Sequence, residues 1–288
     1  MDMIRLELMW RSFLPRALGL VPPTLRRMII GRSDQPSRVA TVLHNLVNYT
    51  VADVSEASPC CGPLQGFKMF TDWRHYRGYI YGNWEPVATE AIVKHVQRGM
   101  CVFDVGAHLG YYSLLFSKCI GPGGRVVSFE AARGNFSTLQ RNITVNNIDN
   151  IEPINLAVFS KSGTIPMSLS SADTGSGNWS ISRELNKDSI QVQTISLDQF
   201  CEANHVLPDF LKIDVEGAEY DVLLGGRDTI GRCQPAMLIE LHHFDGNLAS
   251  NLVPGLLRDW NYRIQWLEKW PQTSQILAHP SSAKPLQV

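Results

Sequence analysis

The sequence lacks the cysteine pattern of a structural metal site. Its six cysteines, of which only Cys60 and Cys61 are adjacent, contain no Cys-x-x-Cys pair. Structural zinc sites normally need such closely spaced pairs, so we expect no structural zinc site. Cys101 and Cys119 lie among apolar residues and are expected to be small buried side chains. Because nothing suggests a disulfide framework, we expect a reduced, cytoplasmic protein.

Long apolar runs and a surplus of positive charge are also missing. No stretch reaches the roughly 18 uncharged apolar residues that a transmembrane helix requires. The formal net charge of the 288 residues is −1, which gives no electrostatic basis for a broad nucleic-acid surface. We therefore expect no nucleic-acid partner. The hydrophobic content of 44% is ordinary for a globular chain, so disorder is not expected.

The first 32 residues mix apolar side chains with six arginines. Arg11 and Arg16 interrupt the apolar core that a signal peptide would need. Two alternatives stay open, namely a helix that packs on the main domain and an amphipathic helix in peripheral contact with a membrane surface. Because Asp2 and Glu7 dilute the basic character, the first is favoured. We predict an N-terminal helical extension over residues 1–60 and one domain over residues 61–288.

From residue 101 onward, short apolar runs alternate with helical patterns. Strands are predicted at 101–105, 125–129, 154–158, 192–195, 210–214, 236–241, 262–267 and 275–278. Helices are predicted between them, one of them over 197–203 with Ser196 as its N-cap. This alternation predicts an α/β fold of the Rossmann type, a mostly parallel seven-stranded sheet with helices on both faces.

The strongest local motif is the segment Asp104-Val105-Gly106-Ala107-His108-Leu109-Gly110, between a predicted buried strand and a helix. Gly106 permits a sharp turn, and Gly110 permits a close approach of strand and helix. The helix N-terminus then offers free N–H groups to an anion. The Gly-x-Gly-x-x-Gly spacing of dinucleotide-binding folds is absent, so a smaller anion such as an amino-acid carboxylate fits better.

Acidic residues lie at or just after the ends of two of the predicted strands. Glu130 ends the strand after the glycine turn, where a carboxylate can accept hydrogen bonds from both hydroxyls of a ribose. Asp214, Glu216 and Glu219 follow the strand at 210–214, at the sheet edge where α/β folds bind ligands. For Asp214 a role in positioning, cation binding or proton transfer is favoured, and for Glu219 only an interaction with the helix dipole.

The segment Ile239-Glu240-Leu241-His242-His243 ends the neighbouring strand. Strand alternation places Glu240 and His242 on one face and His243 on the other. Three interpretations of His242 remain open: a base that takes a proton from a hydroxyl, a ligand of Mg²⁺ or another divalent cation together with Asp214 and Glu240, and a supporting hydrogen-bond partner.

Taken together, these motifs resemble the FkbM family of S-adenosylmethionine-dependent methyltransferases. The family's glycine turn corresponds to Asp104–Gly110, its acid-ending strand to Phe129-Glu130, and its Ile-Asp-x-Glu-Gly-x-Glu block to Ile213–Glu219. The resemblance covers about residues 62–245. It departs from the family pattern at His108, where asparagine is usual, and at Ala131, where proline is common.

The resemblance implies methylation of a hydroxyl on a sugar, glycolipid or polyketide-type small molecule. It implies S-adenosyl-L-methionine as the cofactor, with Asp104, Gly106, Ala107, His108, Gly110, Glu130, Ala157 and Asp214 as the cofactor-binding candidates. Asp214, Glu216 and His242 are the candidate catalytic residues, and Asp214, Glu240 and His242 the candidate ligands of a divalent cation. One alternative is an NAD(P)-dependent oxidoreductase, although the glycine spacing of that class is absent from this sequence. The other is an inactive cofactor-binding or membrane-associated module.

Overall fold

The computed structural model describes residues 55–59, 61–72, 75–169, 179–181, 189–243 and 251–281. The predicted N-terminal helical extension lies almost entirely outside these residues and stays a prediction. The chain divides into a small unit, which contains the described residues up to Thr89 together with Gln140–Ile148, and a main unit of Glu90–Leu139 and Asp149–Val288. No helix within the described ranges is long and apolar enough to cross a membrane.

The main unit is built on a seven-stranded sheet, as the sequence predicts. Its strands are, in spatial order, β12 (Tyr262–Lys269), β13 (Thr273–Pro280), β11 (Ala236–His242), β10 (Phe210–Ile213), β3 (Cys101–Val105), β4 (Arg125–Phe129) and β5 (Ile151–Ile154). The five strands from β11 to β5 are parallel, and β13 runs antiparallel to both β11 and β12. The parallel strands therefore present their carboxyl ends along one edge, where the candidate residues lie.

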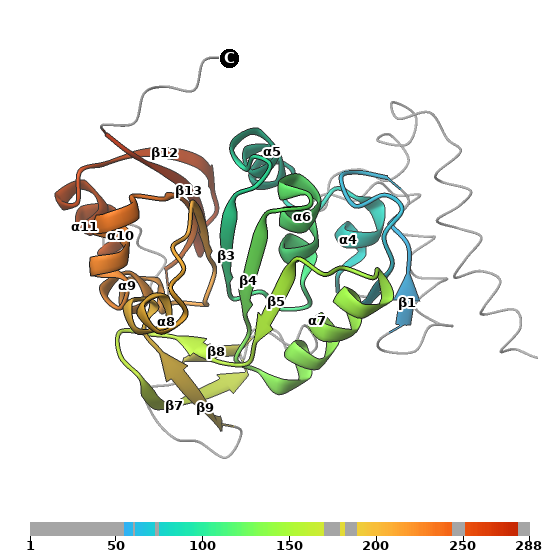
Figure 1. Cartoon of the computed structure of the whole chain (residues 1–288), viewed down its shortest axis with the longest axis horizontal. Coiled ribbons are helices and arrows are strands. Elements are labelled where there is room, and N and C mark those ends of the chain that lie inside the picture. Colours follow the sequence, from blue (N-terminus) through green and yellow to red (C-terminus); the bar gives the residue numbers. More distant parts are fainter. Residues whose placement is uncertain are drawn as a thin grey trace, which may run out of the picture. The chain divides into compact units, whose positions relative to one another are not determined.

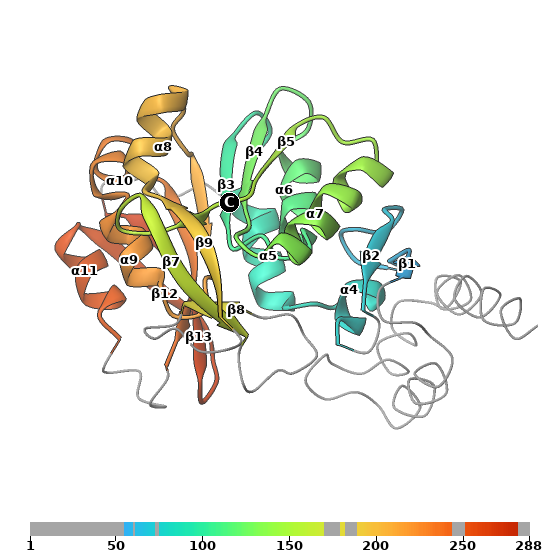
Figure 2. The ribbon, with the colours of Figure 1, turned by 90° about the horizontal axis from the view of Figure 1, so that it is seen from below.

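Helices cover both faces of this sheet (Figures 1 and 2). One of them, α6 (Tyr111–Ile120), packs on β3 and β4. On the opposite face lie α8 (Leu197–Asn204), α9 (Glu219–Leu224), α10 (Arg227–Cys233) and α11 (Val253–Asp259). The chain also forms α5 (Pro86–His95) and α7 (Arg133–Val145). Helices between parallel strands are the expected crossover connections of an α/β fold.

Strand alternation decides which side chains each layer buries. Phe103 and Val105 point to the face covered by α8, where they pack with Phe200, Val222 and other apolar residues in one core. The intervening Asp104 points to the other face, where Ser113 of α6 donates a hydrogen bond to its carboxylate. A polar row thus crosses the sheet beneath α6, because the strand register aligns Asp104 with Lys212 of β10 and with Ser128 of β4.

A second sheet interrupts the main one after β5. It has the order β6 (Ala157–Val158), β9 (Ser189–Ile195), β7 (Gly163–Leu169) and β8 (Trp179–Ile181). The prediction of one strand over 154–158 is wrong, because β5 ends at Ile154 and Ala157 belongs to the second sheet. Asn155 turns the chain at this point, since its side-chain amide donates to the carbonyl oxygens of Glu130 and Ala131 at 2.8 and 3.0 Å.

The small unit contains β1 (Ser55–Ala57) and β2 (Met69–Thr71), which pair antiparallel, and α4 (Arg77–Tyr81). The buried side chain of Asn142, on α7, substitutes for a strand neighbour of β2. Its Oδ1 accepts from the Phe70 amide at 2.6 Å, and its Nδ2 donates to the Phe70 carbonyl at 3.2 Å. One side chain therefore satisfies both backbone groups of this buried residue.

Helix boundaries follow the sequence signals in most cases. Pro86 begins α5, and the Ser196 hydroxyl caps α8 by accepting from the Gln199 amide at 3.2 Å. Helix α5 ends at His95, four residues before Gly99, which has a left-handed φ of 83°. The separate helix α10 was not predicted, because Gly225 and Gly226 indicate only a break after α9.

Candidate active site

The turn between β3 and α6 has the geometry that its glycines suggested. Gly106 has φ +82°, and a Cβ at this position would lie 1.8 Å from the carbonyl oxygen of Asp214. The amides of Gly106 and Ala107 donate to the Phe129 carbonyl at 3.1 and 2.9 Å. Gly110, with φ +91°, caps α6 where a Cβ would lie 2.5 Å from Leu139. The turn is therefore fixed against β4, β10 and α7 at once.

Glu130 joins the next strand directly to this turn. One of its carboxylate oxygens accepts from the His108 amide, and the other accepts from the Ala132 amide, both at 2.8 Å. His108 adopts a left-handed conformation with φ +52°, which aims its N–H at Glu130. Burial raises the pKa of Glu130 to about 7, against the opposing effect of the Ala132 and His108 amides. The turn and the candidate ribose-binding acid thus form one connected structure.

Asp104 is fully buried below the turn. Its Oδ2 accepts from the Ser113 hydroxyl at 2.6 Å, and that hydroxyl in turn accepts from Ser128 at 2.9 Å. Its Oδ1 lies 3.8 Å from the ammonium group of Lys212. Burial raises the pKa of Asp104, and the charge of Lys212 opposes that rise. Because the side chain has no exposed surface, Asp104 supports the turn from beneath.

Asp214 follows β10, beside the turn. Its amide donates to the Val105 carbonyl at 3.0 Å, which extends the pairing of β10 and β3 by one residue. Its Oδ2 lies 3.1 Å from Lys212, whose ammonium group is also 5.0 Å from the centre of the Tyr112 ring. Burial acts to raise the pKa of Asp214, but the charges of Lys212, His242 and His108 and the hydrogen bond from Lys212 together outweigh it and lower the pKa. Asp214 is therefore a stable carboxylate.

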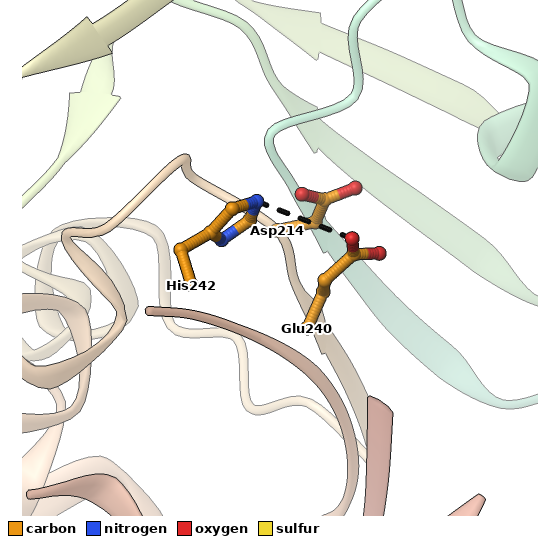
Figure 3. Close-up of side chains that lie close together, drawn as sticks. All are labelled: Asp214, Glu240 and His242. Atoms are coloured by element: carbon orange, nitrogen blue, oxygen red, sulfur yellow. Dashed lines mark ion pairs between the residues drawn. The ribbon is translucent and has the colours of Figure 1, made fainter. Parts of the chain in front are cut away.

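His242, at the end of β11, lies among four carboxylates. Its Nδ1 is 2.8 Å from Glu219, and its Nε2 is 3.3 Å from Glu216 and 4.0 Å from Glu240. Figure 3 shows that His242 and Glu240 converge on Asp214 from the neighbouring strand. This proximity confirms the predicted placement of Glu240 and His242 on one face of β11. The side chain of His243 lies on the other face, where it is buried and contacts Ser274 at 3.1 Å.

The surrounding carboxylates determine the charge of His242. Burial alone would lower the pKa of this imidazole. The hydrogen bond to Glu219 and the charges of Glu219, Asp214 and Glu216 outweigh burial and raise the pKa to about 10. A protonated imidazole has no lone pair with which to accept a proton. In this arrangement His242 is a cation that balances carboxylates, and the predicted role as a base stays a prediction.

The contacts of two residues near His242 were not predicted from the sequence. Glu219 was interpreted only as a helix-dipole residue, but it is 2% exposed and its Oε1 accepts from the Gly217 amide at 2.9 Å while contacting His242. Lys212 is 4% exposed and serves both Asp104 and Asp214. A lysine inside an otherwise apolar buried strand was the available signal, because such a charge needs partners.

The candidate Ala157 occupies a different position from the one predicted. It begins the second sheet, where it pairs with Thr194 of β9, and does not extend β5. The other candidates lie together along the carboxyl ends of β4, β3, β10 and β11. They form two groups, the turn with Glu130 and the cluster of Asp214, Glu216, Glu219, Glu240 and His242, which we call the acidic cluster.

The profile of the methyltransferase FkbM domain matches residues 104–264 of this chain. A curated relative, Methyltransferase 1 of Beauveria bassiana (strain ARSEF 2860), is 24% identical over 168 residues, which cover 52% of this chain and 67% of that protein. Both matches agree in naming a methyltransferase.

Solved structures with a similar fold have lower sequence identity. The methyltransferase FkbM from Methylobacillus flagellatus KT is 20% identical with a TM-score of 0.46, over 63% of this chain and 44% of that one. This chain therefore spans less than half the length of that protein. Fibrillarin from Aeropyrum pernix, solved with natively bound S-adenosyl-L-methionine, is 18% identical with a TM-score of 0.43, over 73% and 77% of the two chains.

The family match spans more than half of the 288 residues. It contains the glycine turn, Glu130 and every member of the acidic cluster. The chain belongs to the FkbM methyltransferase family.

Proposed function

We propose that this methyltransferase transfers the methyl group of S-adenosyl-L-methionine to a hydroxyl group of a small molecule, of the sugar, glycolipid or polyketide type. The observation that carries the proposal is the direct connection between the turn and Glu130, through the 2.8 Å hydrogen bond from the His108 amide. The same sheet edge bears the acidic cluster one strand further on.

Strand order supports a cofactor that lies across the sheet edge. The turn follows β3, Glu130 follows the adjacent β4 on one side, and Asp214 follows the adjacent β10 on the other. A ribose at Glu130 would leave the amino-acid part of the cofactor at the turn and at the start of α6, where N–H groups attract a carboxylate. Its sulfonium would then lie toward Asp214, whose negative charge suits a cation.

The proposed reaction needs orientation more than covalent chemistry. The acceptor oxygen attacks the methyl carbon in line, the new C–O bond forms as the C–S bond breaks, and S-adenosylhomocysteine leaves with the former C–S electron pair. The hydroxyl proton passes to a carboxylate of the acidic cluster, for which Asp214 and Glu216 are the candidates. Holding both reactants in the attack geometry supplies much of the rate enhancement.

The alternatives make different demands on the same edge. A nicotinamide enzyme would seat a pyrophosphate on a Gly-x-Gly-x-x-Gly turn, and here His108 occupies the position of the second glycine. An inactive module has no need for five ionisable residues buried or half-buried at one edge. Membrane contact through the first 32 residues, and a cytoplasmic location, stay predictions.

The first test is calorimetric titration of the full chain with S-adenosyl-L-methionine. We expect saturable one-to-one binding that Glu130→Ala weakens at least about tenfold, because hydrogen bonds to a charged group contribute roughly 1.5–3 kcal/mol. Glu152→Ala is the matched control, since this half-exposed carboxylate lies within the next strand, β5, and pairs with Arg125. A folded wild-type chain that does not bind the cofactor would refute the proposal.

The raised pKa of Glu130 predicts a pH dependence of cofactor binding. Above pH 7 the side chain is mainly a carboxylate and accepts both ribose hydroxyls, whereas below pH 7 its proton removes acceptor capacity. Affinity should therefore fall by up to about tenfold between pH 8 and pH 6, since one pKa unit corresponds to one tenfold step. Titrations of Glu130→Gln across the same range isolate this effect, because the variant cannot titrate. If the cofactor affinities of the wild-type protein and of Glu130→Gln changed with pH in parallel, the assignment of Glu130 as the ribose-binding acid would be contradicted.

A further inference from the structure

Three side chains of the acidic cluster offer ligand atoms that converge on one point. One atom each from Asp214, Glu240 and His242 lies within 4.8 Å of the other two (Figure 3). Ligands at about 2.1 Å from one ion are at most about 4.2 Å apart, so a small rotation of the side chains brings all three to a single ion. They come from the ends of two adjacent parallel strands, which hold them at fixed spacing.

The electrostatics of the cluster favour a divalent cation. His242 is surrounded by the carboxylates of Asp214, Glu216, Glu219 and Glu240. The neighbouring cation Lys212 pairs with Asp214 but is also shared with the buried Asp104. Even with His242 protonated, negative charge exceeds positive charge by two at this edge, and like charges at such distances repel each other. A divalent ion that replaces the Nε2 proton of His242 would reduce this excess from two to one.

Glu219 gives His242 the orientation of a metal ligand. The contact of its Oε1 with Nδ1 at 2.8 Å fixes the donor nitrogen of the ring. That carboxylate is buried and is itself held by the Gly217 amide. The other ring nitrogen, Nε2, therefore faces Glu216 and Glu240. Histidines that bind metals commonly donate their second N–H to a carboxylate in this way.

We propose that Asp214, Glu240 and His242 bind one divalent cation of the Mn²⁺ class, with Glu219 as the positioning residue of His242. Two carboxylates and one imidazole suit Mn²⁺ better than the all-oxygen surroundings typical of Mg²⁺. The role of the ion rests on the proposed function: its open positions would bind the acceptor hydroxyl and lower the pKa of that hydroxyl, whose proton would pass to Glu216 because Asp214 is then a ligand. Binding of the ion itself requires neither the methyl donor nor the acceptor.

The test is a Mn²⁺ titration of the full chain after a chelator has removed bound metals. The electron paramagnetic resonance signal of free Mn²⁺ measures how much of the ion stays unbound. We expect one saturable site per chain. His242→Asn should weaken Mn²⁺ binding at least tenfold. His205→Asn is the matched control, because His205 is exposed and has a left-handed φ of 50°, which asparagine tolerates.

Glu219 provides a second, independent variant pair. Glu219→Ala should weaken Mn²⁺ binding about 10–100-fold, the usual effect of removing a residue that orients a ligand. Glu219→Gln should retain most of the affinity, because its amide oxygen can still accept from Nδ1. A merely structural role of Glu219 would give equal Mn²⁺ affinities for both variants and would overturn its assignment. If His242→Asn does not fold, Glu240→Gln replaces it.

The outcomes separate this inference from the proposed function. A chain that binds S-adenosyl-L-methionine but shows no saturable Mn²⁺ binding would overturn the cation site alone. The same holds if His242→Asn and His205→Asn bind Mn²⁺ equally well. A chain that binds Mn²⁺ but not S-adenosyl-L-methionine would leave the cation site intact and refute the proposed cofactor.

Discussion

Replacement of Gly106 by alanine is expected to destabilise the protein by more than about 4 kcal/mol, a loss reached only when a substitution disrupts the fold. The added Cβ would lie 1.8 Å from the Asp214 carbonyl oxygen and 2.8 Å from its carbon, and both belong to the backbone. No side-chain rotation can relieve such a contact. The turn would have to move away from β10, which also separates the two halves of the candidate site. Chemical denaturation measures the free energy of unfolding.

Gly123→Ala is the control for this prediction. Gly123 has a similar positive φ of 93°, but a Cβ there would meet nothing within 4 Å. Its substitution should cost only the backbone strain of a left-handed alanine, about 1–2 kcal/mol. The difference between the two variants isolates the close approach of the turn to Asp214. Equal losses would show that the two strands are not packed as tightly here as the geometry implies.

Substitution of His242 by asparagine is expected to lower turnover by roughly 10²–10⁴-fold, whether the residue transfers a proton or binds a cation. Affinity for S-adenosyl-L-methionine should stay within about threefold of the wild-type value, because His242 contacts the other members of the acidic cluster and not the turn or Glu130. Release of S-adenosylhomocysteine with a panel of hydroxylated sugars and glycosides measures turnover, and calorimetry measures cofactor affinity.

The adjacent histidine supplies the control for this second experiment. His243 points to the opposite face, is buried, and contacts Ser274. His243→Gln should lower stability while the folded protein keeps its turnover. If His242→Asn loses cofactor affinity and turnover in equal measure, its role in the transfer step is contradicted, and a contribution to cofactor binding replaces it.

Sequence reasoning recovered the parts of the fold that depend on local patterns. Strands β3 and β4 have the predicted bounds, and Ser196 caps α8 as predicted. Apolar runs and caps encode such features within a few residues of one another. The strand predicted across Asn155 was wrong because that residue turns the chain by bonding to backbone about 25 positions earlier. Nothing near Asn155 in the sequence reveals that contact.

In the candidate site, too, local features were predicted and long-range contacts were not. Alternation along β11 was enough to place Glu240 and His242 together, and turn chemistry was enough to identify Gly106. Glu219 was misjudged because its partner His242 lies 23 residues further along the chain. Lys212 was overlooked because its buried partner Asp104 belongs to another strand, β3. Long-range pairing of buried charges is decided by the strand order, which a single sequence does not state.

The polar row beneath α6 has a consequence for folding. Apart from their charged residues, β3 and β10 are short apolar strands that could pair in several alignments. A slip of one residue between them would turn Lys212 toward the apolar core around Phe103 and separate it from Asp104. An unpaired charge buried in apolar surroundings costs several kcal/mol. Lys212, Asp104 and Ser113 therefore favour the native alignment of β3 and β10 over alignments shifted by one residue.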